Sequence, residues 1–312
     1  MDAFIPKFLG SIFTDNPLPD GVNKWDEPLN GRVPVVLIHG TWLNAYNTWD
    51  YLAPELIKAG HAVFAFNYGK DPNCFVGKAS GVYACGYLRR SHREVAQFID
   101  EVIERTGADQ VDLVGHSQGA AQARLFLSDS GGSNADDPTK NRVRKLIGIG
   151  PASHGTTLSG ISTIAGKLDP SNKVHGLLEK ILGGAAIDQR LGSEFGEYLN
   201  QNGDTVPGVD YTLITTAFDG IATPWQDQVF EAGEGATVNN VHLQDGGSRL
   251  DFSSHLSMLY SPRVVDIVLE ALDPQDRTFR RPRILPMLGE FNLPKLPLSR
   301  LSHLSRSSRR RR

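Results

Sequence analysis

Residues 115–119, Gly-His-Ser-Gln-Gly, constrain the fold more than any other part of this 312-residue chain. The apolar run 111–114 before them predicts a buried strand, and the stretch 118–128 predicts a helix. A serine at so sharp a strand-to-helix turn adopts a strained backbone. Side chains two residues before and after it would clash where strand and helix pack together, which accounts for the two glycines. Ser117 is therefore the candidate nucleophile.

The rest of the chain alternates between two kinds of apolar pattern. Runs typical of buried strands fall at 33–39, 62–67, 110–115, 145–150, 211–218 and 238–244. Patterns typical of helices fall at 49–59, 90–106, 118–128 and 262–272. Strands that alternate with helices predict a mostly parallel sheet covered by helices on both faces. Functional groups are then expected at the carboxyl ends of the strands.

A second motif lies upstream, where the run 33–38 ends in His39, Gly40 and Thr41. Gly40 lets the backbone turn, so that an amide near Thr41 can face a developing negative charge. The amide of Gln118, at the start of the predicted helix, supplies a second hydrogen-bond donor. Thr41 and Gln118 are therefore expected to form an oxyanion hole through their backbone N–H groups.

The remaining catalytic groups are expected beyond the last two strands. Asp219 follows the strand 211–218, and His255 lies in a loop after 238–244. A serine hydroxyl is a weak nucleophile at neutral pH and needs a base, for which imidazole has a suitable pKa. A carboxylate then fixes the tautomer of that imidazole. The chain order Ser117, Asp219, His255 therefore predicts a catalytic triad.

Other residues compete for these roles. His154, after the strand 145–150, is the main alternative base and could instead line the site. Asp227 and Asp251 are the alternative acids, but both are less well placed relative to a strand end. His242 is assigned to packing and His39 to organisation of its loop. His116 lies beside the nucleophile, but its side chain is expected to point away from the site.

Together these segments resemble the class 2 lipase family, secreted bacterial triacylglycerol lipases of the α/β-hydrolase superfamily. The matching segments are 21–25, 34–42, 63–69, 111–119, 153–160, 211–224, 241–245 and 254–256. The resemblance implies an α/β-hydrolase fold and hydrolysis of acylglycerol esters without a metal or other cofactor. It places the nucleophile on Ser117, the acid on Asp219 and the base on His255.

One long segment, about 155–208, interrupts the alternation of strands and helices, because Gly-rich turns there separate short apolar helices. Two interpretations stay open: a lid or acyl-chain wall over the site, and a static packing excursion. The lid hypothesis gives Leu177 and Ile181 a place on the acyl site. The predicted substrate-binding residues are therefore Trp42, His154, Leu177 and Ile181.

Residues 277–312 form a basic tail with eleven Lys or Arg and one Glu, whereas the whole chain carries a formal charge of −3. Four prolines in this tail prevent long helices. A disordered, solvated extension is expected, with an electrostatic tether to an anionic membrane or nucleic acid as the alternative. The catalytic domain is accordingly placed at 1–276. A basic tail on an acidic body does not indicate a nucleic-acid enzyme, so no nucleic-acid partner is expected.

Two cysteines, Cys74 and Cys85, flank a Gly-rich loop. A disulfide that closes this loop and a pair of reduced thiols are both consistent with the spacing. Metal binding is not expected, since no neighbouring His or Cys completes a tetrahedral set.

The sequence leaves two alternatives for the cellular location of the protein. The N-terminal residues carry an early acid, a proline and no small-residue cleavage site, so no secretory signal is expected. This favours a cytoplasmic or membrane-surface location, whereas the family resemblance favours secretion.

The predicted function is that of a serine carboxylic-ester hydrolase, a triacylglycerol lipase or esterase, with a lipid or ester substrate and transient contact with a lipid interface. An acyltransferase or phospholipase with the same triad is the alternative within enzymes. A non-catalytic lipid-binding protein is the alternative outside them, and the complete triad disfavours it.

Overall fold

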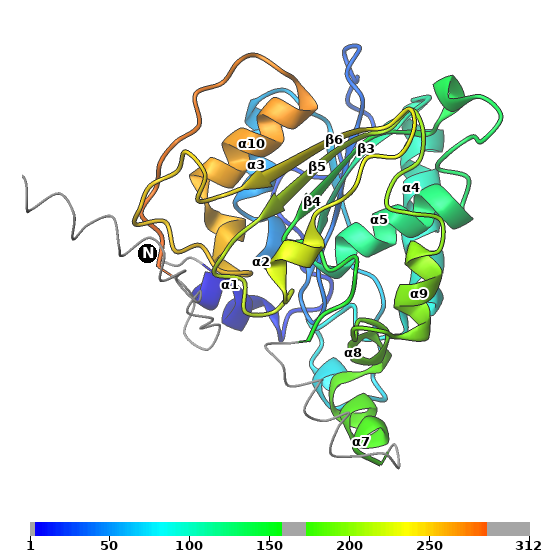
Figure 1. Cartoon of the computed structure of the whole chain (residues 1–312), viewed down its shortest axis with the longest axis vertical. Coiled ribbons are helices and arrows are strands. Elements are labelled where there is room, and N and C mark those ends of the chain that lie inside the picture. The colour runs from blue at the N-terminus through cyan, green and yellow to red at the C-terminus, as the bar shows by residue number, and fades with distance from the viewer. Residues whose placement is uncertain (1–3, 158–172, 286–312) are drawn as a thin grey trace, which may run out of the picture.

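A computed structural model describes residues 4–157 and 173–285, in which six strands form one sheet (Figure 1). The strand order is β2-β1-β3-β4-β5-β6, and every neighbouring pair is parallel. The strands are β1 Val35–Ile38, β2 Val63–Ala65, β3 Val111–His116, β4 Val143–Ile149, β5 Asp210–Thr215 and β6 Thr237–His242. Each of these strands lies on a run that the sequence predicted, which confirms the mostly parallel sheet.

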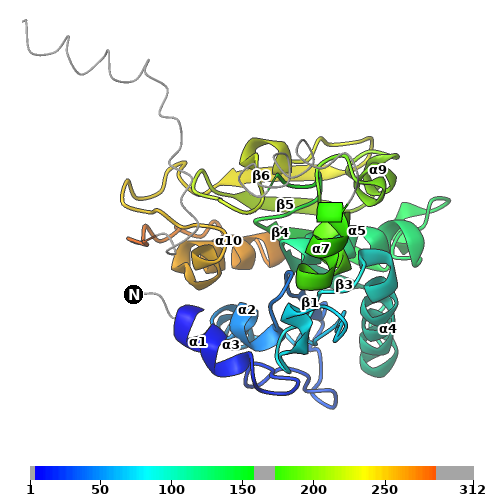
Figure 2. The same ribbon diagram turned by 90° about the horizontal axis from the view of Figure 1, so that it is seen from below.

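Helices cover the sheet on both faces, as Figure 2 shows. On one face lie α2 Ala45–Trp49, α3 Leu52–Lys58 and α10 Pro262–Leu272, and on the other α4 Leu88–Thr106 and α5 Gln118–Asp129. Two apolar clusters fill the spaces between these layers, one around Trp49 and Leu56 and the other around Ile99 and Phe126. Strands β1 and β2 are buried at every residue and consist only of apolar residues, as strands covered on both faces require. The edge strand β6 has no buried residue and carries polar side chains.

Short 3-10 helices connect these elements: η1 Val76–Lys78, η2 Pro138–Lys140, η3 Trp225–Gln228 and η4 Ser257–Tyr260. The predicted helix 49–59 is divided between α2 and α3. Asn44 starts α2 with a capping box, in which its side chain and that of Asn47 each accept the other's backbone N–H. Within residues 4–157 and 173–285, no helix has the length and apolar character needed to span a bilayer.

Helix α1, Phe4–Ser11, was not predicted from the sequence. A proline in its first turn is compatible with a helix, since the N–H groups there have no intrahelical acceptor. At its start, the ring of Phe4 meets that of Tyr260 edge-on, with 6.1 Å between the ring centroids. At its end, the Ser11 hydroxyl accepts hydrogen bonds from the side-chain amides of Asn44 and Asn47, both at 3.1 Å. Helix α1 is therefore fixed to the domain at both ends.

The segment between β4 and β5 contains α7 Lys173–Leu182, α8 Gly184–Asp188 and α9 Glu194–Asn200. Helix α9 packs on α5 through Phe195 and Leu199, which lie in one apolar cluster with Leu125. Figure 1 shows α7 farthest from the sheet. Residues 158–172 of the predicted insertion lie outside the described residues.

The first residues of the predicted tail, 277–285, contact the domain. The Arg280 guanidinium forms an ion pair with Asp266 of α10 at 2.8 Å. The N–H of Phe252 donates to the carbonyl of Ile284 at 2.9 Å. The division of the chain at residue 276 and the disorder of the tail stay predictions. Residues 286–312 lie outside the described residues.

Candidate active site

Ser117 occupies the turn between β3 and α5 with φ 53° and ψ −120°. This is a left-handed conformation that non-glycine residues rarely adopt, and it concentrates at functional sites. A Cβ on Gly115 would lie 2.5 Å from the backbone nitrogen of Ala120, and one on Gly119 would lie 2.0 Å from the carbonyl oxygen of Ile38. Strand and helix are therefore as tightly packed as the sequence predicted, and both glycines are required.

Asp219 and His255 form a buried pair. The Nδ1 atom of His255 donates to Oδ2 of Asp219 at 2.7 Å, and both side chains are about 2% exposed. The other carboxylate oxygen accepts the N–H groups of Ile221 and Ala222 at 2.9 and 2.7 Å. Because the proton of the neutral imidazole is held on Nδ1, its basic lone pair lies on Nε2. His255 and Ser117 line the same cavity.

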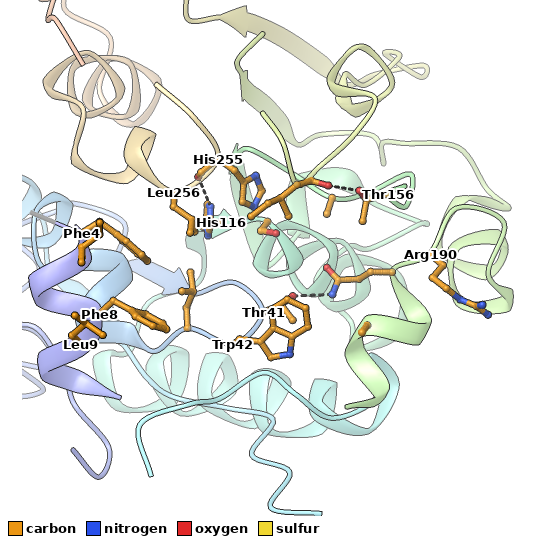
Figure 3. Close-up of a pocket in the computed structure, with 17 residues that line it drawn as sticks. Phe4, Phe8, Leu9, Thr41, Trp42, His116, Thr156, Arg190, His255 and Leu256 are labelled. Carbon is orange, nitrogen blue, oxygen red and sulfur yellow. Dashed lines mark hydrogen bonds between the residues drawn. The ribbon is translucent and has the colours of Figure 1, made fainter. Parts of the chain in front are cut away.

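His116 lies against His255 rather than away from the site. Its Nε2 donates to the carbonyl oxygen of His255 at 3.1 Å, and the two ring centroids are 4.7 Å apart (Figure 3). Complete burial, and then the proximity of His255, hold the pKa of His116 well below its usual value. A neutral His116 supports the loop that carries His255, a role that its place beside the serine did not reveal.

The loop after β1 approaches the serine closely at Gly40. A Cβ at this position would lie 2.7 Å from Nδ1 of His116 and 3.1 Å from Cβ of Ser117, so only glycine fits. His39 is buried, and its backbone carbonyl accepts the Tyr68 hydroxyl at 2.8 Å. Burial lowers the pKa of His39 to about 4, which suits a neutral residue that organises this loop.

The two predicted oxyanion-hole residues are joined through their side chains. The Thr41 hydroxyl donates to Oε1 of Gln118 at 2.8 Å. Gln189 at the end of α8 donates from Nε2 to Oγ1 of Thr41 at 2.8 Å and to Oε1 of Gln118 at 3.2 Å. Gln118 is the first residue of α5, where a backbone N–H has no intrahelical acceptor. Gln189 was missed by the sequence analysis, because no motif near it indicates a contact with residues so distant in the chain.

Trp42 follows in the same loop with φ 59°. Its indole Nε1 donates to the carbonyl of Leu182 at 2.7 Å, and its side chain lines the cavity. The structure therefore places this predicted substrate-binding residue at the wall beside Ser117. The hydrogen bond to Leu182, the last residue of α7, holds the indole in position.

The cavity beside Ser117 and His255 measures about 380 Å³, within the range of small-molecule sites. The polar lining residues include Thr41, Gln189, His116, Ser117 and His255. One side is apolar and comes largely from α1. Figure 3 shows side chains of α1 on the side of the cavity away from Arg190. The lining residues of α1 are Phe4, Ile5, Phe8 and Leu9.

Three predicted substrate-binding residues lie outside this cavity lining. His154 bonds through Nε2 to Asp204 at 2.6 Å and through Nδ1 to the carbonyl of Asp227. These bonds, and edge contact with Phe230, turn its ring away from the cavity. Leu177 and Ile181 on α7 are 57% and 39% exposed, because α7 stands away from the sheet. The cavity lining thus includes none of these three residues, and their acyl-site role stays a prediction.

The alternative acids are also accounted for. Asp251 accepts the hydroxyl and N–H of Ser253 and lies outside the cavity lining, as does Asp227. His242 stacks on Trp225 with 4.3 Å between centroids, which agrees with its assignment to packing.

Cys74 and Cys85 are buried neighbours with free thiols. The Cys74 thiol donates to the carbonyl of Asp71 at 3.3 Å, and that of Cys85 to the carbonyl of Tyr83 at 3.5 Å. Burial, and then the proximity of Cys74, raise the pKa of the Cys85 thiol. Of the two alternatives left open by the sequence, the structure has reduced thiols. Their pairing under oxidising conditions stays a prediction.

Within the described part of the chain, no three His, Cys, Asp or Glu side chains lie close enough to hold a metal ion. The polar lining of the cavity consists of hydroxyl, amide and imidazole groups around one serine, together with Arg190. Such an arrangement suits covalent catalysis by an oxygen nucleophile with a paired base.

Comparison with solved structures identifies the fold. The chain is similar to Aspergillus fumigatus lipase B with a TM-score of 0.61 and 20% identity, over 84% of this chain and 56% of that one. It is also similar to the mature Bacillus licheniformis lipase BlEst2, with a TM-score of 0.52 and 16% identity, over 79% and 94%. The chain thus spans little more than half of the Aspergillus protein. These likenesses confirm the α/β-hydrolase fold.

No curated protein sequence matches the chain. A family model described as Lipase (class 2) matches residues 32–247, more than half of the chain. The match includes Thr41, Ser117 and Asp219, begins after α1 and ends before His255. It confirms the family resemblance drawn from the sequence motifs and supports a lipolytic hydrolase activity. The chain belongs to the class 2 lipase family.

Proposed function

We propose that the protein is a serine carboxylic-ester hydrolase that acts on acylglycerols, triacylglycerols above all, through an acyl-enzyme on Ser117. The observation that carries the proposal is the position of Ser117 and the buried His255–Asp219 pair on one cavity, opposite an apolar wall. A paired imidazole activates the serine, while the wall accommodates an acyl chain.

In the first half of the proposed reaction, Oγ of Ser117 attacks the ester carbonyl carbon and Nε2 of His255 takes the hydroxyl proton. The resulting imidazolium is stabilised by Asp219, whose remaining oxygen is held by two backbone N–H groups. The carbonyl oxygen becomes an oxyanion, for which the N–H groups of Thr41 and Gln118 are the proposed donors. Collapse of this intermediate breaks the ester C–O bond, and His255 returns the proton to the leaving alcohol.

In the second half, His255 removes a proton from water, whose oxygen attacks the acyl carbon on Ser117. The second tetrahedral intermediate breaks the bond to Oγ, and the proton passes to Ser117. The products are a fatty acid and an alcohol, and the enzyme is regenerated without a cofactor. The apolar side chains of α1 favour the acyl chain by removing its surface from water.

A fluorophosphonate that forms a stable bond with activated serines tests the proposal. We expect covalent labelling of the wild type and its complete loss in Ser117→Ala, together with at least a roughly 10⁴-fold loss of ester hydrolysis. Ser128→Ala, on the exposed part of the same helix, is the control and should be labelled normally. Labelling or more than a tenth of the activity in a folded Ser117→Ala protein would contradict the assignment. Fatty acid release, rather than transfer to an added alcohol, separates hydrolysis from acyl transfer.

A further inference from the structure

Thr156 lies between two parts of the candidate active site, the loop of the acid and the residue that supports the oxyanion donors. It follows β4 in the chain and lines the catalytic cavity, and it is only 4% exposed. The reaction proposed above does not use its hydroxyl. A buried hydroxyl at this place therefore needs another explanation, and its hydrogen bonds supply one.

The side chain of Thr156 holds the loop that follows Asp219. Its hydroxyl donates to the carbonyl of Ile221 and accepts the N–H of Thr223 at 3.1 Å (Figure 3). Ile221 donates its own N–H to Oδ1 of Asp219 at 2.9 Å, as Ala222 does at 2.7 Å. The threonine hydroxyl is thus bonded to backbone groups on both sides of a residue that binds the carboxylate.

The backbone of Thr156 holds the end of α8. Its N–H donates to the carbonyl of Gln189 at 2.8 Å, and its carbonyl accepts the N–H of Leu191 at 3.2 Å, as in a parallel β-bridge. The side-chain amide of Gln189 in turn donates to Thr41 and Gln118, the candidate oxyanion residues. One residue therefore connects the acid loop to the residue that supports the oxyanion donors.

Gly155 allows this close approach of two backbones. Its φ is 79°, and a Cβ at this position would lie 3.0 Å from the carbonyl oxygen of Arg190. Its carbonyl accepts Nε2 of Gln228 at 3.0 Å. On the other side of Thr156, the N–H of Thr157 donates to the carbonyl of Thr223 at 2.9 Å. The position of Thr156 is therefore fixed by its neighbours before any substrate binds.

The sheet alone does not set the distance between the two parts that Thr156 connects. Asp219 follows β5 and Thr41 follows β1, and β3 and β4 lie between these strands. Both residues lie in loops beyond the strand ends, where the hydrogen bonds of the sheet no longer act. A cross-connection between the loops is what keeps acid, base and oxyanion donors in register.

We propose that Thr156 is a positioning residue that fixes the loop of Asp219 relative to Gln189. The inference rests on the proposed function and adds a residue that acts through both of these side chains. A valine at this position would place a methyl group against the carbonyl of Ile221, which must then move toward another donor. The N–H of Ile221 would move with it, away from Asp219. Such a displacement lowers the rate of the chemical step more than it weakens substrate binding.

Thr156→Val tests the proposal, because valine keeps the branched shape and lacks the hydroxyl. We expect kcat to fall about 10-fold on both an acetyl and a dodecanoyl p-nitrophenyl ester, with KM within about 2-fold of the wild-type value. Thr156→Ser keeps the hydroxyl and should retain kcat within about 3-fold.

Thr157→Val is the matched control. Its hydroxyl contacts the hydroxyl of Thr223 at 2.8 Å, and the residue lies outside the cavity lining. This variant should keep kcat within about 2-fold of the wild-type value. A kcat that falls as far in Thr157→Val or in Thr156→Ser as in Thr156→Val would overturn the proposal.

Amide hydrogen exchange provides a readout that does not depend on hydrolysis. The N–H groups of Ile221 and Ala222 bind Asp219 directly, so they should exchange about 10-fold faster in Thr156→Val than in the wild type, and at nearly wild-type rates in Thr156→Ser and Thr157→Val. Thermal melting checks that the variants are folded. An unchanged kcat, or unchanged exchange of these two amides, in a folded Thr156→Val protein would overturn the proposal.

The two proposals can fail separately. A wild type that reacts with a fluorophosphonate but cleaves no acylglycerol would refute the proposed substrate. The rate of labelling of Ser117 then takes the place of kcat, because it depends on the same base and oxyanion donors. It should fall about 10-fold in Thr156→Val, and an unchanged labelling rate would reject the role of Thr156.

Discussion

The two sides of the catalytic cavity are built on different principles. The polar side comes mainly from loops at the carboxyl ends of parallel strands, with Gln189 added from the end of α8. The apolar side is α1, a helix that precedes the whole sheet and docks through contacts with distant residues. The sheet topology thus positions the candidate catalytic residues, whereas an added helix supplies apolar lining to the cavity.

A functional division follows from this difference. Changes on the polar side should lower kcat for all acyl chain lengths, since they act on charge that develops at the carbonyl group. Changes on the apolar side should lower kcat/KM progressively as the chain lengthens, since they act on buried apolar surface. The predictions below test this division, from the largest expected effect to the smallest.

The largest effect is expected at the proposed base. His255→Ala should lower kcat by about 10⁴-fold or more on both short and long esters, because the members of such a triad act as a unit. His154→Ala removes a histidine with a similar hydrogen bond to an aspartate, 2.6 Å instead of 2.7 Å, but outside the cavity lining. It should change kcat less than 3-fold. Steady-state kinetics on a short and a long p-nitrophenyl ester measure kcat for both variants. A dead, well-folded His154→Ala enzyme would reverse the assignment.

The next effect concerns Gln189 as a positioning residue. Gln189→Ala removes the amide that donates to Thr41 and Gln118, so kcat should fall roughly 30-fold with KM nearly unchanged, less than for loss of an oxyanion donor itself. Gln189→Glu keeps the shape but replaces the donor with an acceptor, and should be at least as impaired. A purely structural role would lower the melting temperature and leave kcat of the folded fraction intact.

A smaller, chain-length-dependent effect is expected at α1, where the molecule offers a matched control. Ile5 and Leu9 are 39% and 58% exposed and line the cavity, whereas Ile181 and Leu177 on α7 are 39% and 57% exposed and do not. Ile5→Ser with Leu9→Ser should lower kcat/KM about 10-fold for a dodecanoyl ester and less than 2-fold for an acetyl ester.

The paired change Leu177→Ser with Ile181→Ser should leave kcat/KM for both esters within about 2-fold of the wild-type value, since these side chains do not line the cavity. Hydrolysis rates across a series of acyl lengths provide the comparison. If the α7 pair weakened long-chain hydrolysis as much as the α1 pair, the lid hypothesis for α7 would return and α1 would lose its special role.

The smallest effect is on stability and comes from the second His–Asp pair. The hydrogen bond that His154 donates to Asp204 raises the pKa of His154. Burial has the largest single effect and raises the pKa of Asp204, but the hydrogen bonds from His154 and the N–H of Glu231, with the charges of His154 and Arg124, together lower it. The stabilisation by His154 is present below its ordinary pKa, near 6.5, and is lost as the pH rises through the raised value. The stabilisation by Asp204 is present above the ordinary pKa of an aspartate and is lost as the pH falls through the lowered value.

The His154–Asp204 pair should therefore stabilise the folded protein most between about pH 4 and 6.5. His154→Gln should lower the free energy of unfolding by about 1 kcal/mol at pH 5.5 and by less at pH 9. Denaturant unfolding at the two pH values measures the difference. A larger cost at pH 9 would contradict the sign of the argument.

The sequence was sufficient for those parts of the site that short-range patterns encode. Ser117, Asp219 and the loop of Thr41 each follow an apolar run, and parallel strands bring their carboxyl ends to one edge of the sheet. Gln189 escaped prediction because its partners Thr41 and Gln118 are distant in the chain, and one glutamine in a short helix has no local pattern. Leu177 and Ile181 were expected on the acyl site but do not line the cavity, because amphipathic spacing identifies an apolar face without showing what it packs against.

The docking of α1 has a consequence for the order in which the protein is made. Helix α1 leaves the ribosome before all six described strands, whereas its aromatic partner Tyr260 leaves after them. His255 is synthesised only five residues before that partner. A nascent chain that already contains the turn of Ser117 thus still lacks the candidate base His255. It also lacks Tyr260, which contacts the start of α1. The apolar face of α1 stays uncovered through most of synthesis, when it is open to chaperones and to other nascent chains.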